Sequence, residues 1–225
     1  MRDGVRCVVF DLDDTLYLER EYVQSGFEAL EPWVKDRFQL SDFAAKAWEL
    51  FEAGARTTIF DQVLQAEGVE TNAEAISVMV SLYRAHKPKL SWQPDALQTV
   101  AMLRGRGTPL AVLTDGPAQS QRAKVEALEV ENWVHMAVLT AELGPGRGKP
   151  CPDGFLKIQE VIGLAPNAFI YVGDNPKKDF IGPSMLGWKT ARVRRPLGLH
   201  FEVPSGPDVN LEVRDLRELL IALDG

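Results

Sequence analysis

The chain has 225 residues, of which 45% are hydrophobic and 25% charged, as is ordinary for a globular protein with one large core or a core carrying a smaller insert. Its net charge of −7 argues against a nucleic-acid partner, and no apolar run approaches the ~18 residues of a membrane span, so we expect neither kind of partner. The two cysteines make no disulfide framework, and the first residues run directly into an apolar stretch without a secretory leader, so we expect a cytoplasmic protein.

The first predicted element is a short strand, CVVFD at 7–11, and a long block without strand patterns follows it. Residues 17–90 indicate one helix after another, at 19–38, 42–56, 60–67 and 72–87. We predict that this block is an inserted all-helical domain. Its return hinge would be HKPKLSWQP at 86–94, which contains two prolines.

From residue 94 onward, apolar runs alternate with helical patterns. The runs are continuously hydrophobic, which is typical of strands buried on both faces of a parallel sheet. The alternation predicts the α/β class: a Rossmann-like, doubly wound parallel sheet formed by residues 1–16 and 91–225, interrupted by the helical domain at 17–90. The further strands are predicted at 109–116, 135–140, 169–175, 189–193 and 208–213, and the helices at 94–107, 119–130, 151–164 and 213–225.

Polar residues at the ends of the predicted strands and in the loops that follow are the candidate site residues, because ligands of open α/β sheets bind beyond the carboxyl ends of the strands. Three aspartates, one threonine and one lysine meet this description, and we expect them to converge at one edge of the sheet. They are Asp11, Asp13, Thr114, Lys149 and Asp174.

Three carboxylates at one edge would repel one another, since two unit charges ~4 Å apart interact by about 4 kcal/mol at an effective dielectric of ~20. The sequence therefore indicates a bound cation, and an oxygen-only set of ligands suits Mg²⁺. Together with the ammonium of Lys149 and the hydroxyl of Thr114, such a cation would favour a dianionic group such as a phosphoryl.

The aspartates of DLDD have different predicted roles. Asp11 and Asp13 are two residues apart, so their side chains would point the same way if the extended backbone continued past the strand. One could then attack while the other moves protons. We interpret Asp14 as a turn or N-cap residue for a segment that begins near Leu16.

Four segments occur in order along the chain: VFDLDDTL, LTDG, GKPCPDGF and VGDNPKKDF. Together they resemble the four signature motifs of the haloacid dehalogenase-like (HAD) hydrolase superfamily. Residues 17–90 lie where that family inserts its helical type I cap domain. The resemblance implies a Mg²⁺-dependent phosphatase that acts on a small phosphorylated metabolite of the sugar phosphate, nucleotide or phosphoglycolate type.

Carried over residue by residue, the resemblance implies that Asp11 is a nucleophile that forms an aspartyl-phosphate intermediate. Asp13 would be the general acid for the leaving group and then the general base for water. Thr114, Asp115 and Lys149 would bind the phosphorylated substrate.

The same resemblance implies that Mg²⁺ is held by Asp11, by Asp13 through its backbone carbonyl, and by Asp174. Asp179 matches the second acidic position of the fourth motif, where it would steady Lys149 or a metal-bound water. A role for Asp179 as a helix cap is the alternative.

Two other functions stay open at this point: a 2-haloacid dehalogenase on the same fold, and a non-catalytic HAD-like binding module. Dehalogenases of this family lack an aspartate two residues after the nucleophile, because halide departure needs no protonation. Asp13 therefore favours a phosphatase over a dehalogenase. With Thr15 the motif also resembles the DxDxT of the phosphatases, whereas the sugar phosphomutases of the family usually carry DxDG. The sequence does not separate a monomer from a homodimer.

Two further patterns are assigned no binding function. GPGRGK at 144–149 is not a P-loop, because the required first glycine would fall at Leu143. The basic cluster Arg192, Arg194 and Arg195 is interpreted as a solvated strand end.

Overall fold

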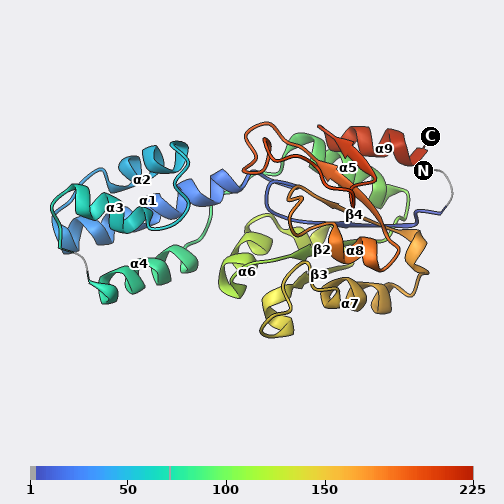
Figure 1. Ribbon diagram of the computed structural model, residues 1–225, viewed down its shortest axis with the longest axis horizontal. Helices are drawn as coiled ribbons and strands as arrows, with labels where there is room; N and C mark the ends of the chain where they lie inside the picture. Colours follow the sequence, from blue (N-terminus) through green and yellow to red (C-terminus); the bar gives the residue numbers. More distant parts are fainter. Residues whose placement is uncertain (1–3, 71, 225) are drawn as a thin grey trace. The chain divides into compact units, whose positions relative to one another are not determined.

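The computed structural model describes residues 4–70 and 72–224. It divides the chain into two compact units (Figure 1). One unit contains the chain up to Arg20 and again from Leu90 onward, and it holds the sheet. The other unit, Glu21–Lys89, is helical.

The sheet has six parallel strands in the order β3-β2-β1-β4-β5-β6. This is the strand order of a doubly wound Rossmann sheet, so the predicted fold class is confirmed. The strands are β1 (Cys7–Phe10), β2 (Leu110–Thr114), β3 (Met136–Leu139), β4 (Phe169–Gly173), β5 (Lys189–Val193) and β6 (Leu211–Val213).

Helices cover both faces of the sheet, which explains the continuous hydrophobicity of its strands. On one face, Phe155 and Ile158 of α7 pack against Cys7 and Val9 of β1 in the same buried cluster. Figure 1 shows α5 and α9 on the opposite face. The helices of this unit are α5 (Pro94–Gly105), α6 (Ala118–Ala127), α7 (Asp153–Ile162), α8 (Ile181–Met185) and α9 (Leu216–Asp224).

The helical unit is built on a close approach of its first and last helices. A Cβ atom at Gly26 would lie 2.3 Å from the ring of Tyr83, so only glycine fits this position without a shift of the ring. The side chain of Asn72 accepts a hydrogen bond from the amide of Ala75 and caps the last helix of the unit. The helices are α1 (Glu19–Phe38), which begins in the sheet unit, α2 (Phe43–Glu52), α3 (Ile59–Ala66) and α4 (Ala73–Ala85).

None of the helices in residues 4–70 and 72–224 combines the length and the apolar character required to cross a membrane.

Two of the three arginines at the end of β5 and just beyond it are buried, so the interpretation of this cluster as a solvated strand end was wrong. Arg192 is 0% exposed and donates to the carbonyl oxygens of Asp174, Val203 and His200. Arg195 is 6% exposed. A guanidinium with five donors can satisfy several loop carbonyls at once, and this explains why the cluster is internal.

Arg195 joins three segments of the sheet unit. Its guanidinium donates to the carbonyl oxygen of Thr15 and, at 2.9 Å, to Oδ1 of Asp95 at the start of α5. Oδ2 of Asp95 accepts from the amide of Leu216 at the start of α9. The pair therefore fixes the turn after β1 against two helices of one face.

We predict that Asp95→Asn lowers the free energy of unfolding by about 3–5 kcal/mol, because it leaves the charge of Arg195 buried without its partner. Urea denaturation measures the change. The matched control is Arg106→Gln, which breaks the exposed pair with Asp224 and should leave the midpoint unchanged. Equal effects of the two variants would contradict the prediction.

Candidate active site

The predicted site residues gather at one edge of the sheet because every strand is parallel. Asp11 follows β1, Thr114 ends β2 and Asp174 follows β4. The amide of Asp11 donates to the carbonyl oxygen of Val172 at 2.7 Å, which holds Asp11 against the end of β4. Lys149 reaches the same edge from the loop before α7.

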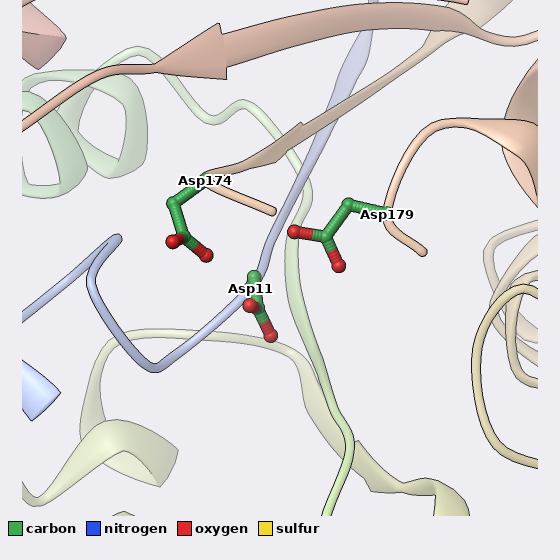
Figure 2. Close-up of side chains that lie close together, drawn as sticks. All are labelled: Asp11, Asp174 and Asp179. Carbon is green, nitrogen blue, oxygen red and sulfur yellow. The ribbon is translucent and has the colours of Figure 1, made fainter. Parts of the chain in front are cut away.

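Three buried carboxylates, from Asp11, Asp174 and Asp179, lie with oxygen atoms within 4.8 Å of one another (Figure 2). Burial raises the pKa of Asp11 to about 6, although Lys149 acts in the opposite direction. Burial and the neighbouring carboxylates, Asp179 first among them, raise the pKa of Asp174 well above its usual value. Among the described residues, no lysine or arginine forms an ion pair with Asp174. These oxygen-only, like-charged donors fit a divalent cation such as Mg²⁺.

The carboxylate cluster includes Asp179 and not the side chain of Asp13. Oδ1 of Asp179 lies 2.7 Å from Nζ of Lys149, and Oδ2 accepts from the amide of Asn175 at 2.8 Å. These two contacts place Asp179 beside Lys149.

The ammonium of Lys149 is enclosed by three oxygen atoms. It pairs with Asp11 at 2.8 Å and with Asp179, and it donates to the hydroxyl of Tyr171 at 2.9 Å. Tyr171 in turn donates to the carbonyl oxygen of Leu113. Burial alone would lower the pKa of Lys149, but the two carboxylates outweigh it and raise that pKa well above its usual value. Two donors of the ammonium are thereby used in hydrogen bonds, to Asp11 and to Tyr171, and Asp179 adds a second charge contact.

Asp13 has different surroundings from Asp11. Lys124 donates to its Oδ1 at 2.7 Å, the hydroxyl of Tyr17 donates to the same oxygen, and Gln121 donates to Oδ2 at 2.9 Å. Burial raises the pKa of Asp13, but the ammonium of Lys124 and these hydrogen bonds outweigh it and hold that pKa below its usual value.

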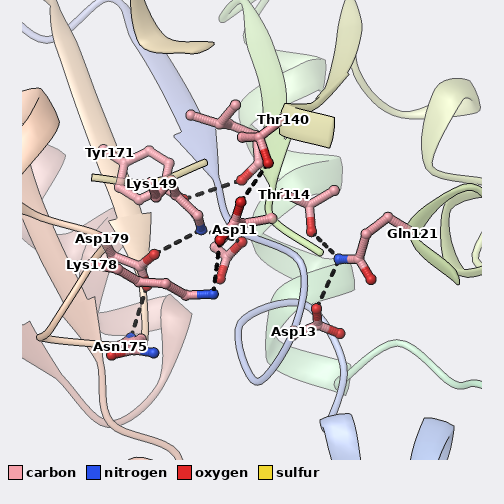
Figure 3. Close-up of polar contacts among 12 residues, drawn as sticks. Asp11, Asp13, Thr114, Gln121, Thr140, Lys149, Tyr171, Asn175, Lys178 and Asp179 are labelled. Atoms are coloured by element: carbon pink, nitrogen blue, oxygen red, sulfur yellow. Dashed lines mark hydrogen bonds and ion pairs between the residues drawn. The ribbon is translucent and has the colours of Figure 1, made fainter. Parts of the chain in front are cut away.

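The extended backbone that would align Asp11 with Asp13 does not persist. β1 ends at Phe10, and the amide of Leu16 bonds to the carbonyl oxygen of Leu12, which turns the chain. The condition for the two side chains to point the same way, a continued extended backbone, is therefore not met. Figure 3 shows Asp11 between two groups, with Lys149 on one side and Asp13 on the other.

Asp14 lies in this turn, with a φ of 49° in the left-handed region. Its carboxylate accepts from the amide of Glu19, the first residue of α1, and from the amide of Leu199. Burial raises the pKa of Asp14 to about 6. Asp14 is thus a turn residue, as expected, but the helix it contacts begins at Glu19 and not near Leu16.

The side chains of Thr114 and Asp115, at the end of β2, contact different residues. The hydroxyl of Thr114 is fully buried and accepts a hydrogen bond from Gln121 (Figure 3). The carboxylate of Asp115 instead accepts from the hydroxyl of Thr140 and lies 3.5 Å from Nζ of Lys178. The side chain of Asp115 thus joins neighbouring loops.

The sequence prediction missed the residues that hold the predicted ones in place: Tyr17, Gln121, Lys124, Tyr171 and Lys178. Gln121 and Lys124 are polar residues on the buried face of α6, spaced three apart. The sequence carried no signal for them, because the burial of Lys124 depends on the tertiary fold.

A parallel Rossmann sheet, the four motifs in order along the chain and an aspartate cluster at the carboxyl edge of the sheet are the arrangement of a HAD-type hydrolase. A family model described as haloacid dehalogenase-like hydrolase matches residues 5–184, and the chain belongs to this family. The glyceraldehyde 3-phosphate phosphatase of Methanopyrus kandleri is 29% identical over 227 residues, covering 96% of each chain.

Solved structures share the fold. The HAD-hydrolase YfnB from Bacillus subtilis, solved bound to magnesium, has a TM-score of 0.72 and 19% identity over 99% of this chain and 100% of its own. The L-2-haloacid dehalogenase from Xanthobacter autotrophicus has a TM-score of 0.63 and 20% identity, covering 98% of this chain and 99% of its own. The fold is therefore common to hydrolases of different reactions.

We predict that Gly173→Ala destabilises the site, because its Cβ would lie 2.6 Å from Oδ2 of Asp179, whose Oδ1 pairs with Lys149. Overpacking of this kind costs about 1–3 kcal/mol in urea denaturation. The control is Gly105→Ala, where a Cβ meets nothing within 4 Å and should stabilise by about 0.4–1 kcal/mol. A neutral Gly173→Ala would show that Asp179 is not tightly held.

Proposed function

We propose that the protein is a Mg²⁺-dependent phosphomonoesterase that acts on a small phosphorylated metabolite. The observation that carries the proposal is the presence of two neighbouring carboxylates in different environments. Asp11 lies in the carboxylate cluster with Lys149, and Asp13 lies apart from it with Lys124. One nucleophile and one proton carrier are what a two-step phosphoryl transfer requires.

In the first step, a carboxylate oxygen of Asp11 attacks phosphorus and the bond from phosphorus to the leaving oxygen breaks. Asp13 has to carry a proton in the substrate complex, and it donates that proton to the leaving oxygen. In the second step Asp13 takes a proton from water, the water oxygen attacks phosphorus, and the bond between phosphorus and Asp11 breaks. Thr114 and Lys149 hold the phosphoryl oxygens throughout.

Asp11 and Asp174 would hold Mg²⁺ in this proposal, together with the backbone carbonyl of Asp13. The cation would offset the negative charge of the phosphoryl group next to these carboxylates. Asp179 keeps Lys149 in place.

The substrate class follows from the relatives and not from the site. A curated relative covering nearly the whole chain is named for glyceraldehyde 3-phosphate, which supports a small sugar phosphate. Nucleotides and phosphoglycolate are the other members of the class to compare. We propose that residues 17–90 form a cap domain that selects among these substrates. We also propose that the protein is cytoplasmic.

A dehalogenase is the second candidate, because the fold is shared with one. Asp13 argues against it, since a halide leaves without a proton. Chloride release from a 2-haloacid without Mg²⁺ would favour the dehalogenase. A chain inert towards both substrate classes would favour a non-catalytic binding module.

We predict that Asp11→Asn lowers kcat for p-nitrophenyl phosphate and for glyceraldehyde 3-phosphate by about 10⁴-fold or more, because it removes the nucleophile. Mass spectrometry of acid-quenched wild-type protein should find phosphate on the peptide that contains Asp11, and find none in the variant. Turnover of Asp11→Asn near the wild-type rate would refute the assignment.

We also predict that EDTA abolishes hydrolysis and that Mg²⁺ restores it. Calorimetry with Asp174→Asn should give Mg²⁺ affinity at least ~10-fold weaker than wild type. The same variant without metal should melt at a higher temperature than wild type, because one of the like charges is removed. Activity that persists in EDTA would contradict the metal requirement.

A further inference from the structure

Two side chains of α6, Gln121 and Lys124, contact the proposed reacting residues although neither follows a strand. They are three residues apart, so they lie on the same face of the helix, and they are 1% and 4% exposed. We propose that Gln121 and Lys124 are positioning residues that orient Asp13 and Thr114 for phosphoryl transfer. This inference rests on the proposed phosphatase function and deepens it.

The first argument is the burial of a complete ion pair. Nζ of Lys124 lies 2.7 Å from Oδ1 of Asp13, and the two side chains are 5% and 17% exposed. A buried ammonium is costly unless it is paired, so Lys124 is poorly explained as an ordinary surface lysine. A charge-assisted hydrogen bond of this length also restricts the orientation of the Asp13 carboxylate.

The second argument is that both oxygens of Asp13 are held. Tyr17 and Lys124 donate to Oδ1, and Gln121 donates to Oδ2. With donors on both oxygens, the carboxylate cannot rotate about its last bond without losing a contact. The position of the proposed proton carrier is thereby determined by α6 and by the turn after β1.

The third argument concerns the hydrogen bonds that the Thr114 hydroxyl accepts and donates. A carboxylate only accepts, so the amide atom of Gln121 that faces Asp13 is the nitrogen Nε2. The same nitrogen donates its second hydrogen to Oγ1 of Thr114 (Figure 3). One lone pair of this hydroxyl is then occupied, and its own hydrogen is free to point at a phosphoryl oxygen.

Gln121 thus connects the proton carrier to the phosphoryl-binding hydroxyl through one amide group. Glycine at position 116 accommodates this arrangement, since a Cβ there would lie 3.2 Å from Cδ of Gln121. The φ of Gly116, +155°, is also one that a residue with a side chain rarely adopts.

A misplaced Asp13 has a specific kinetic signature. An alkoxide needs a proton in order to leave, whereas p-nitrophenolate leaves without one. Loss of Asp13 orientation should therefore slow transfer from an alkyl phosphate much more than transfer from p-nitrophenyl phosphate. Loss of fold would slow both equally.

The experiment measures single-turnover release of the leaving group, with Mg²⁺, from glyceraldehyde 3-phosphate and from p-nitrophenyl phosphate. The variants are Lys124→Met, Lys124→Arg and Gln121→Leu, with Asp13→Asn as the reference for a missing acid. The control is Lys157→Met, an exposed lysine of α7 outside the site, which should behave as wild type. Thermal melts accompany every variant.

We expect Lys124→Met to slow the alkyl phosphate by about 10²-fold or more and the aryl phosphate by less than about 5-fold, following Asp13→Asn. Lys124→Arg should recover part of the alkyl rate. Gln121→Leu, which removes no charge, should slow both substrates, because it also releases Thr114, and it should slow the alkyl phosphate more.

Equal losses on both substrates in Lys124→Met and Gln121→Leu would overturn the inference, as would an alkyl rate that does not change. If Lys124→Met does not fold, Lys124→Arg and Gln121→Leu decide the question by the same comparison.

Asp11→Asn separates the two proposals. If this variant stays active, the phosphatase mechanism fails. If it is inactive and the α6 variants show no difference between the substrates, only the positioning role fails.

Discussion

The charge balance around Lys149 is the interaction on which the rest of the site depends. Its ammonium, with a side chain that is 0% exposed, lies between the carboxylates of Asp11 and Asp179. None of these charges could be buried alone without a large desolvation cost. The neighbouring parallel strands β1 and β4 bring them together, and Tyr171 and Gly173 of β4 provide the hydroxyl and the space that keep them in register.

The short loop after β1 separates two carboxylates that are close in sequence. Asp11 continues the ladder to β4 and joins the acidic cluster, where its pKa is raised. Asp13 follows the turn and meets Lys124, which holds its pKa down. Two carboxylates that are two positions apart in the sequence therefore have different charged partners, Lys149 for Asp11 and Lys124 for Asp13.

The comparison with known proteins shows that proteins with different names share this fold. The same architecture is found in a dehalogenase and in a hydrolase bound to magnesium, so the sheet alone does not select a reaction. At the edge of this sheet, Gln121 and Lys124 of α6 contact Asp13 and Thr114 directly.

The sequence alone determined the fold class, because continuous apolar runs and helical spacing are properties of neighbouring residues. It also predicted that Asp11, Thr114, Lys149 and Asp174 would lie close together, since the strands of a parallel sheet end at one edge. Their catalytic roles stay predictions. It missed the short helix α8 and the burial of Arg192 and Arg195.

Tertiary structure decided the contacts between residues far apart in the chain. Arg195 bonds to Thr15 across 180 positions, and Lys149 meets Asp11 across 138. It also decided that Lys124 is an internal cation. Hydropathy patterns do not indicate which loop packs on which helix. They predict a charged residue to be exposed, and only the fold shows the partner that allows it to be buried.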